Sequence, residues 1–245
     1  MRSWVLGLSF LLLCGCGSRR IAVRVSADDQ FELAKNRFDS KKYSEAAESF
    51  KRVIFEHPGS DLVDDAQHYL AECYFLMGDY TQAREEYTFL LDNLPHSPYR
   101  AQAFFRLGVC YYRSSSPHQL NQSQTRKALE IFEDFATRFP DSELLPQVRE
   151  YKRSCLEKLA EKQLEAGKHY LRMGKYSSAE IYLRDGIQSF PDSRHVKEFH
   201  LLLGECYEKQ GETDKALLAY REVAQGNDEF ANTARKRLEK MEEKR

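Results

Sequence analysis

The chain has 245 residues, with 37 Lys and Arg against 38 Asp and Glu, and a formal net charge of −1. A near-neutral balance lacks the basic excess that neutralises phosphates, so binding to nucleic acid is not expected. With 15 Phe and 14 Tyr but only 12 Gly and 7 Pro, the composition favours a folded, helix-rich chain over a disordered one.

Residues 1–15 have the pattern of a secretory signal. Arg2 is followed by an apolar run from Trp4 to Leu13. Ten helical residues rise about 15 Å, half of the roughly 30 Å hydrocarbon core, so this run is too short to span a bilayer. A charged start, a short apolar run and small residues before a cleavage point predict a segment that is removed on secretion.

The end of this segment, Leu13-Cys14-Gly15-Cys16, resembles a lipobox. The resemblance implies that Cys16 becomes the N-terminus as S-diacylglycerol and N-acyl cysteine, a set of chains that anchors stably in a membrane. Cys14 fits poorly because Leu13 would then occupy the small-residue position. In such lipoproteins Asp after the Cys favours the inner membrane, and here Gly17 implies the outer membrane. The alternative is an ordinary secretory signal with incidental cysteines.

Residues 16–27 are expected to comprise the lipidated Cys and a tether. After them, one pattern recurs five times along the chain. Each copy has Ala, then an aromatic residue or Leu four positions later and an apolar or small residue three after that, and four copies close with Pro. The copies are Ala46-Phe50-Val53-Pro58, Ala83-Tyr87-Leu90-Pro95, Ala128-Phe132-Phe135-Pro140, Ala179-Leu183-Gly186-Pro191 and Ala216-Tyr220-Val223.

A preceding helix is marked by Leu70-Ala71, Leu107-Gly108 and Leu203-Gly204, each with a Tyr three residues after the small residue. Small residues belong where helices cross closely, and Pro ends the second helix of each unit. Serines after the prolines (Ser60, Ser97, Ser142 and Ser193) are expected to be N-caps, with Pro98 in a first helical position. The pattern resembles the tetratricopeptide repeat, which implies an all-α solenoid of five helix–turn–helix units.

The spacing between repeats predicts the organisation of the chain. Repeats 1–3 occupy 28–140, with an insert at about 114–124 in the third. A helical pattern from Leu145 to Leu171 predicts one long helix, which begins a second part, 141–228, with repeats 4–5. Residues 229–245 are expected to form a C-terminal capping helix and a charged tail.

The lipobox, the five repeats, the third-repeat insert and the long helix together resemble the BamD family of outer-membrane-protein assembly lipoproteins. The resemblance covers roughly residues 28–240. It implies a lipid-anchored, non-catalytic scaffold in the outer membrane, facing the periplasm. The implied partners are the barrel assembly protein, accessory assembly lipoproteins and unfolded barrel precursors.

In such solenoids the first helix of each unit lines the concave face. Its inward positions are rich in aromatic residues in repeats 1–3 and in charged residues and Leu in repeats 4–5. The first set includes Phe31, Lys35, Phe38, His68, Glu72, Phe75, Phe105, Tyr112 and Arg113, and the second Leu164, Lys168, Leu171, Arg172, Glu198, Leu201, Glu205 and Lys209.

Two interpretations of the aromatic residues stay open. Phe31, Phe38, Phe75, Phe105 and Tyr112 could bind an extended peptide with an apolar, aromatic end, such as a barrel precursor, while the charged half docks a folded partner. Alternatively, these rings simply pack between neighbouring helices.

Other motifs do not indicate an enzyme. Cys73, Cys110 and Cys206 occupy equivalent positions in separate repeats, and with Cys155 they are expected to be buried free thiols. Asp64 and His68 are expected to form a surface pair rather than half of a metal site. No zinc spacing, phosphate-binding loop or hydrolase motif is present, so no metal, cofactor or catalysis is expected.

Two further functions are compatible with such a scaffold. A repeat lipoprotein coordinating cell-envelope or division processes shares this scaffold, but such proteins usually carry a coiled coil before the repeats, which this sequence does not show. An anchored regulator of a hydrolase would need a catalytic partner.

Overall fold

A computed structural model describes residues 25–243, and all regular secondary structure in that part is α-helical, as predicted. The helices are α1 (Ala27–Asp39), α2 (Tyr43–Glu56), α3 (Val63–Met77), α4 (Tyr80–Asn93), α5 (Arg100–Arg113), α6 (Ser123–Arg138), α7 (Leu145–Arg172), α8 (Tyr176–Ser189), α9 (Val196–Gln210), α10 (Thr213–Ala224) and α11 (Glu229–Glu242). Within this part of the chain, no helix combines the length and apolar composition that crossing a bilayer requires.

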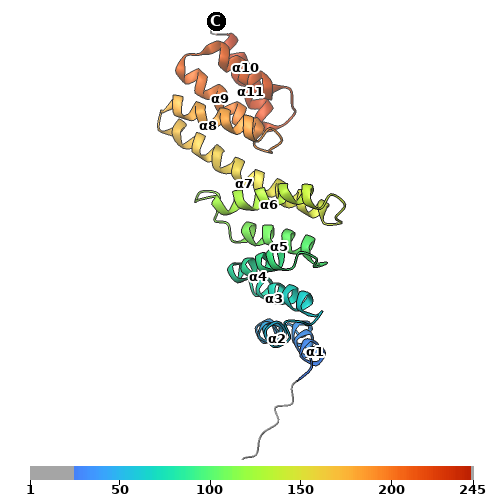
Figure 1. Cartoon of the computed structure of the whole chain (residues 1–245). Helices are drawn as coiled ribbons and strands as arrows, with labels where there is room; N and C mark the ends of the chain where they lie inside the picture. Colours follow the sequence, from blue (N-terminus) through green and yellow to red (C-terminus); the bar gives the residue numbers. More distant parts are fainter. Residues whose placement is uncertain (1–24, 244–245) are drawn as a thin grey trace, which may run out of the picture.

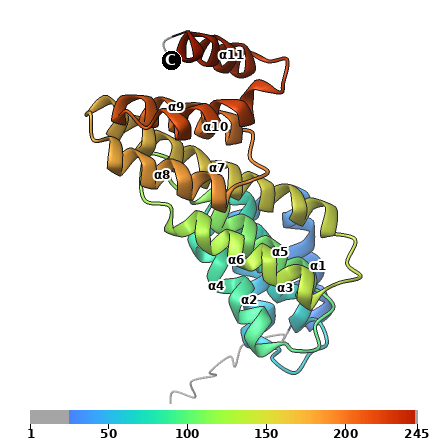
Figure 2. The same cartoon turned by 90° about the horizontal axis from the view of Figure 1, so that it is seen from above.

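The helices stack into an elongated array in which each packs mainly against its neighbours along the chain (Figure 1). Five consecutive pairs run from α1–α2 to α9–α10, and α11 lies at the end of the array, against α10 and α9 (Figure 2). The apolar core is accordingly divided into four clusters spaced along the array. This arrangement confirms the tetratricopeptide-repeat solenoid of five units with a capping helix.

Close helix crossings depend on small residues that face large ones. The repeat alanines, from Ala46 to Ala216, are fully buried. Gly108 faces Phe132, and a Cβ built on Gly108 would lie 2.6 Å from the ring. Gly204 faces Tyr220 in the same way, at 2.5 Å. These contacts explain the alternation of small and bulky positions, because a close crossing leaves no room for a Cβ.

The turns between repeats differ from the expectation of simple serine N-caps. In each turn the serine Oγ accepts a hydrogen bond from the backbone N–H two residues later, at 3.1–3.3 Å, and its carbonyl accepts from the N–H three residues later. The four serines therefore form a turn ahead of the helix, and the cap positions belong to Leu62, Tyr99, Leu144 and His195. Pro98 lies in this turn because α5 begins only at Arg100.

Helix α7 is the longest element, with 28 residues, and it follows the predicted unbroken pattern. Its N-terminal part packs on α6 and α5, and its C-terminal part packs on α8 and α9. The helix therefore belongs to both the third and the fourth unit. The third-repeat insert connects α5 to α6 and lies against α7.

Candidate binding surfaces

The first two predicted aromatic residues lie together in one cluster of rings. Phe31 meets the edge of Phe50 at 5.6 Å between centroids, and Phe38 meets Tyr69 at 5.1 Å. The ammonium of Lys35 lies 5.0 Å from the centroid of Tyr69. Phe31 and Phe38 are half-buried, so each ring both packs and keeps partly accessible surface.

Phe75 is half-buried, and a cation packs against its ring. The guanidinium carbon of Arg106 is 4.4 Å from the Phe75 ring centroid, and Arg106 also bonds the carboxylate of Glu72 at 2.9 and 3.2 Å. Tyr87 donates to the same carboxylate at 2.6 Å. Burial, together with the Glu72 charge and hydrogen bond, raises the pKa of Tyr87 well above its usual value. Glu72, which was predicted to face the concave surface, therefore belongs to a buried network that joins α3, α4 and α5.

Phe105 and Tyr112 both pack against the ring of Tyr151 from α7. The ring centroids of Phe105 and Tyr151 are 5.7 Å apart, and those of Tyr112 and Tyr151 are 5.5 Å apart. Phe105 is only 4% exposed, so its ring is part of the core. Tyr112 is half-buried and borders a hollow in the surface.

All five predicted aromatic residues thus pack against neighbouring groups, and four of them keep partly exposed surface. Tyr69 and Tyr151, which organise the two aromatic groups, were missed by the sequence reasoning. Tyr69 is adjacent to the expected inward position His68, and Tyr151 lies where the long helix interrupts the repeat spacing. A search for aromatic residues next to the inward positions would have found Tyr69.

In the charged half, five of the predicted inward residues line one hollow of about 420 Å³. They are Lys168, Leu171, Arg172, Glu205 and Lys209, and Tyr176 and Leu202 complete the lining. Lys168 forms ion pairs with Glu198 at 2.7 Å and Glu165 at 3.1 Å. Burial lowers the pKa of Lys168, but these two carboxylates outweigh it and raise the pKa overall. Leu164 is instead buried in the core.

His68 is not the surface residue that was expected. It is 4% exposed, and its ring stacks on Tyr99 at 4.1 Å between centroids. Tyr99 in turn donates a hydrogen bond to Asp65. Burial lowers the pKa of His68. The expected pairing with Asp64 is therefore wrong, because stacking on the next repeat takes the imidazole into the interior.

Cys73, Cys110, Cys155 and Cys206 are all buried and free, as expected. Burial raises the pKa of the Cys73, Cys110 and Cys155 thiols to about 12. Among residues 25–243, His, Cys, Asp and Glu form no group of three able to hold a metal ion.

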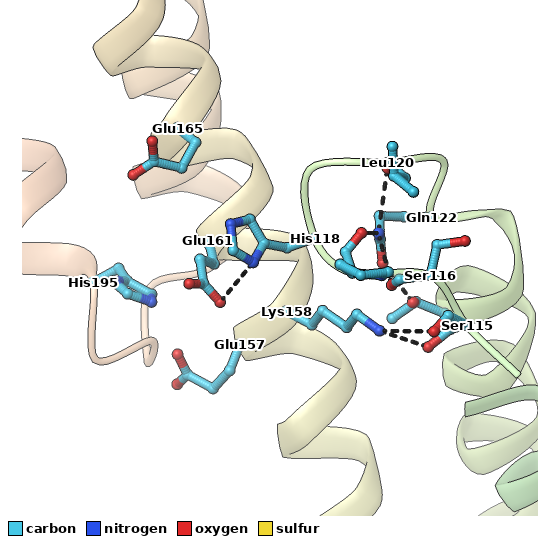
Figure 3. A network of polar contacts seen from close by, with 12 residues as sticks. Ser115, Ser116, His118, Leu120, Gln122, Glu157, Lys158, Glu161, Glu165 and His195 are labelled. Atoms are coloured by element: carbon cyan, nitrogen blue, oxygen red, sulfur yellow. Dashed lines mark hydrogen bonds and ion pairs between the residues drawn. The ribbon is translucent and has the colours of Figure 1, made fainter. Parts of the chain in front are cut away.

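The third-repeat insert is fastened to α7 by polar contacts (Figure 3). Lys158 donates to the Ser115 Oγ at 2.7 Å, and His118 Nδ1 lies 3.4 Å from a Glu161 carboxylate oxygen. Within the insert, Gln122 donates to the Pro117 carbonyl at 2.7 Å. Burial lowers the pKa of Lys158. These bonds hold the loop beside α7, where it forms one wall of a hollow of about 600 Å³.

The predicted lipidation site, Cys16, lies outside the described residues. It is therefore the one predicted site residue that the structure does not place.

Comparisons with known proteins give the chain its relatives. It is 27% identical over 178 residues to the outer membrane protein assembly factor BamD of Rickettsia prowazekii, covering 73% of this chain and 71% of that protein. The BamD proteins of Caulobacter vibrioides and Haemophilus influenzae are 23% and 22% identical, covering 76% and 82% of this chain and 61% and 80% of theirs.

Among solved structures, the TPR2AB-domain:pHSP90 complex of yeast Sti1 aligns with a TM-score of 0.47 and 15% identity. The alignment covers 80% of this chain and 76% of that one. A family model described as YfiO, outer membrane lipoprotein, matches residues 24–223, which is nearly the whole helical array. The chain therefore belongs to the YfiO family of outer membrane lipoproteins.

Proposed function

We propose that this protein is a non-catalytic scaffold of the barrel assembly machinery. It is anchored in the outer membrane through lipid on Cys16, faces the periplasm, binds the barrel assembly protein and accessory lipoproteins, and helps receive and insert barrel precursors. The observation that carries the proposal is the family match across residues 24–223, whose curated relatives are named outer membrane protein assembly factors.

The two parts of the solenoid divide this work in our proposal. Residues 28–140 receive the precursor along the half-buried rings of Phe31, Phe38, Phe75 and Tyr112, while buried Phe105 shapes the surface from beneath. Residues 141–228 dock the folded partner, and the charged hollow whose lining includes Arg172, Glu205 and Lys209 supports that assignment. Aromatic anchors suit apolar peptides, and charged surfaces suit preformed partners.

Purification from membranes in mild detergent tests the scaffold role. We expect a stoichiometric partner that is an outer-membrane barrel assembly protein, and depletion should reduce the amount of barrel proteins in the outer membrane. Septation defects with normal barrel levels would instead support the alternative, a lipoprotein that coordinates envelope or division processes.

The anchor is tested separately by mass spectrometry of the mature N-terminus. Acyl mass on Cys16, lost in Cys16→Ser together with outer-membrane localisation, is the expected result. A mature protein cleaved elsewhere and free of lipid contradicts it.

The peptide surface is tested with a fluorescent peptide that has the apolar, aromatic C-terminus of a barrel precursor. Phe31→Leu and Phe38→Leu keep apolar packing but remove the aromatic faces, and we expect each to weaken binding by about tenfold, the loss of one ring contact. Phe139→Leu is the matched control, because Phe139 is half-buried against Phe104 and Phe135 outside the proposed surface. Unchanged affinity in both test variants rejects the aromatic surface.

A further inference from the structure

A groove runs across α7 between the third-repeat insert and the turn that joins α8 to α9. Two hollows, of about 600 Å³ and about 370 Å³, share Arg153 and Glu157 in their linings and so meet at this point of the helix. We infer that this α7 groove binds an acidic segment of a partner protein that places one apolar side chain in the smaller hollow. The inference holds whether or not the protein serves barrel assembly.

The walls of the α7 groove are held in place by bonds to α7 itself. On one side Lys158 holds Ser115, and Lys162 donates to the Leu120 carbonyl at 2.7 Å. On the other side Glu157 accepts from the Ser193 Oγ at 2.7 Å and from the backbone N–H of Arg194 at 3.1 Å. Figure 3 shows both walls, with Lys158 directed to the insert and Glu157 on the opposite side of the helix. A preformed groove lowers the ordering cost of binding.

The charge of the groove favours an acidic ligand. Its lining contains Arg149, Lys152, Arg153, Lys158 and Arg194 against the carboxylates of Glu157, Glu161 and Asp192, although the whole chain carries −1. Lys152 pairs with Glu133 at 3.2 Å, and Arg194 lies beside Glu157.

Arg149 and Arg153 are the unused cations of the groove. Both are exposed, and no ion pair or side-chain hydrogen bond engages either within the described residues. They stand one helical turn apart, an arrangement of like charges that slightly destabilises an isolated helix. A partner carboxylate would remove this repulsion and gain charge-assisted hydrogen bonds from guanidinium groups.

The smaller hollow supplies an apolar contact beside these arginines. Leu156 of α7 and Phe190 and Pro191 of the α8–α9 turn contribute its apolar surface. At about 370 Å³, the hollow has room for one Leu or Phe side chain. An apolar hollow flanked by cations matches a peptide in which a large apolar residue follows or precedes Asp or Glu, because both contacts can then form at once.

The test uses the full protein in detergent and a fluorescein-labelled peptide with one Leu between pairs of Asp. We expect saturable binding. Arg149→Glu with Arg153→Glu should weaken it by at least about tenfold, and so should replacing each Asp of the peptide by Asn. Arg126→Glu with Arg221→Glu is the matched control, since it makes the same charge change at exposed arginines elsewhere. Circular dichroism verifies that each variant keeps its helix content.

Three outcomes overturn the inference. The first is no saturable binding of the acidic peptide, and the second is equal loss in the control variant. The third is binding of vesicles containing phosphatidylglycerol, abolished by the arginine substitutions, while the peptide does not bind; the groove then recognises anionic lipid instead. Replacing the peptide Leu by Ser should also weaken binding, and unchanged affinity rejects the apolar contact.

Discussion

Arg106 of α5 holds the buried carboxylate of Glu72 in α3 through two hydrogen bonds, from Nε at 2.9 Å and from Nη2 at 3.2 Å. Glu72 is 6% exposed. The pair joins the second repeat to the third, since both residues come from first helices of neighbouring units. Its energetic role follows from burial rather than from attraction alone, because a buried charge without its partner is costly.

Arg106→Met should therefore lower the free energy of unfolding by about 3–5 kcal/mol, since Glu72 would keep only the Tyr87 hydroxyl. Denaturation in guanidinium chloride measures this difference. Arg126→Met, at an exposed position of α6, is the control and should change stability little. Adding Glu72→Gln to Arg106→Met should restore part of the loss, and a double variant as unstable as the single one would contradict this explanation.

Gly186→Ala is expected to destabilise the protein, although Ala is the better helix former by about 1 kcal/mol. A Cβ at Gly186 would overlap the buried ring of Phe199, and overpacking costs roughly 1–3 kcal/mol. Thermal unfolding followed by circular dichroism tests the sign of the change. Gly59→Ala is the comparison, because a Cβ there meets nothing within 4 Å. A Gly186→Ala protein at least as stable as the unmodified one would show that Phe199 moves aside freely.

Stability should fall as the pH drops through about 6.5. Burial lowers the pKa of His68 in the folded state, so the unfolded chain takes up the proton first and is favoured on acidification. The loss begins near the unfolded value of 6.5 and levels off below the lowered folded pKa. Burial also lowers the pKa of His200, which adds a slope of the same sign.

His68→Phe, which keeps a ring stacked on Tyr99, should reduce this slope between pH 7.5 and pH 5. Urea unfolding at a series of pH values measures it. His96→Gln, in the turn before α5, is the control and should leave the slope as it is. An undiminished slope in His68→Phe assigns the pH dependence elsewhere.

The thiols of Cys73, Cys110 and Cys155 should resist alkylation in the native protein. Burial raises their pKa to about 12, which leaves roughly one thiolate in ten thousand at pH 8. Iodoacetamide labelling followed by mass spectrometry should modify them at the rate of unfolding, and urea should accelerate the reaction. Rapid modification of any one of them without urea would reveal local opening around that residue.

Much of the fold could be predicted because the residues that pack together within a repeat lie close together in the sequence. Ala83 and Tyr87 are one helical turn apart, and both are fully buried as a small and a large partner. The serine turns were harder to predict. Ser97 forms a turn just before the helix, and only the backbone geometry distinguishes such a turn from an N-cap.

Contacts between units could not be read from spacing. His68 is buried by Tyr99, which comes from the following repeat, and no local pattern links the two. The α7 groove was missed for the same reason: Arg153 and Phe190 line one hollow only because the long helix runs past the α8–α9 turn. Arg172 and Lys209, which line the charged hollow, were predicted to face inward because they hold equivalent positions in their own helices, but the hollow itself was not predicted.

Helix α7 gives the molecule a mechanical property. At 1.5 Å per residue, its 28 residues form a rod of about 42 Å that is built into both parts of the solenoid. A flexible joint between the parts would let each rotate independently, whereas this rod limits rotation of one part relative to the other. A rotation of the first repeats therefore also reorients the last ones. Two ligands bound at opposite ends of the array would keep a fixed orientation relative to each other.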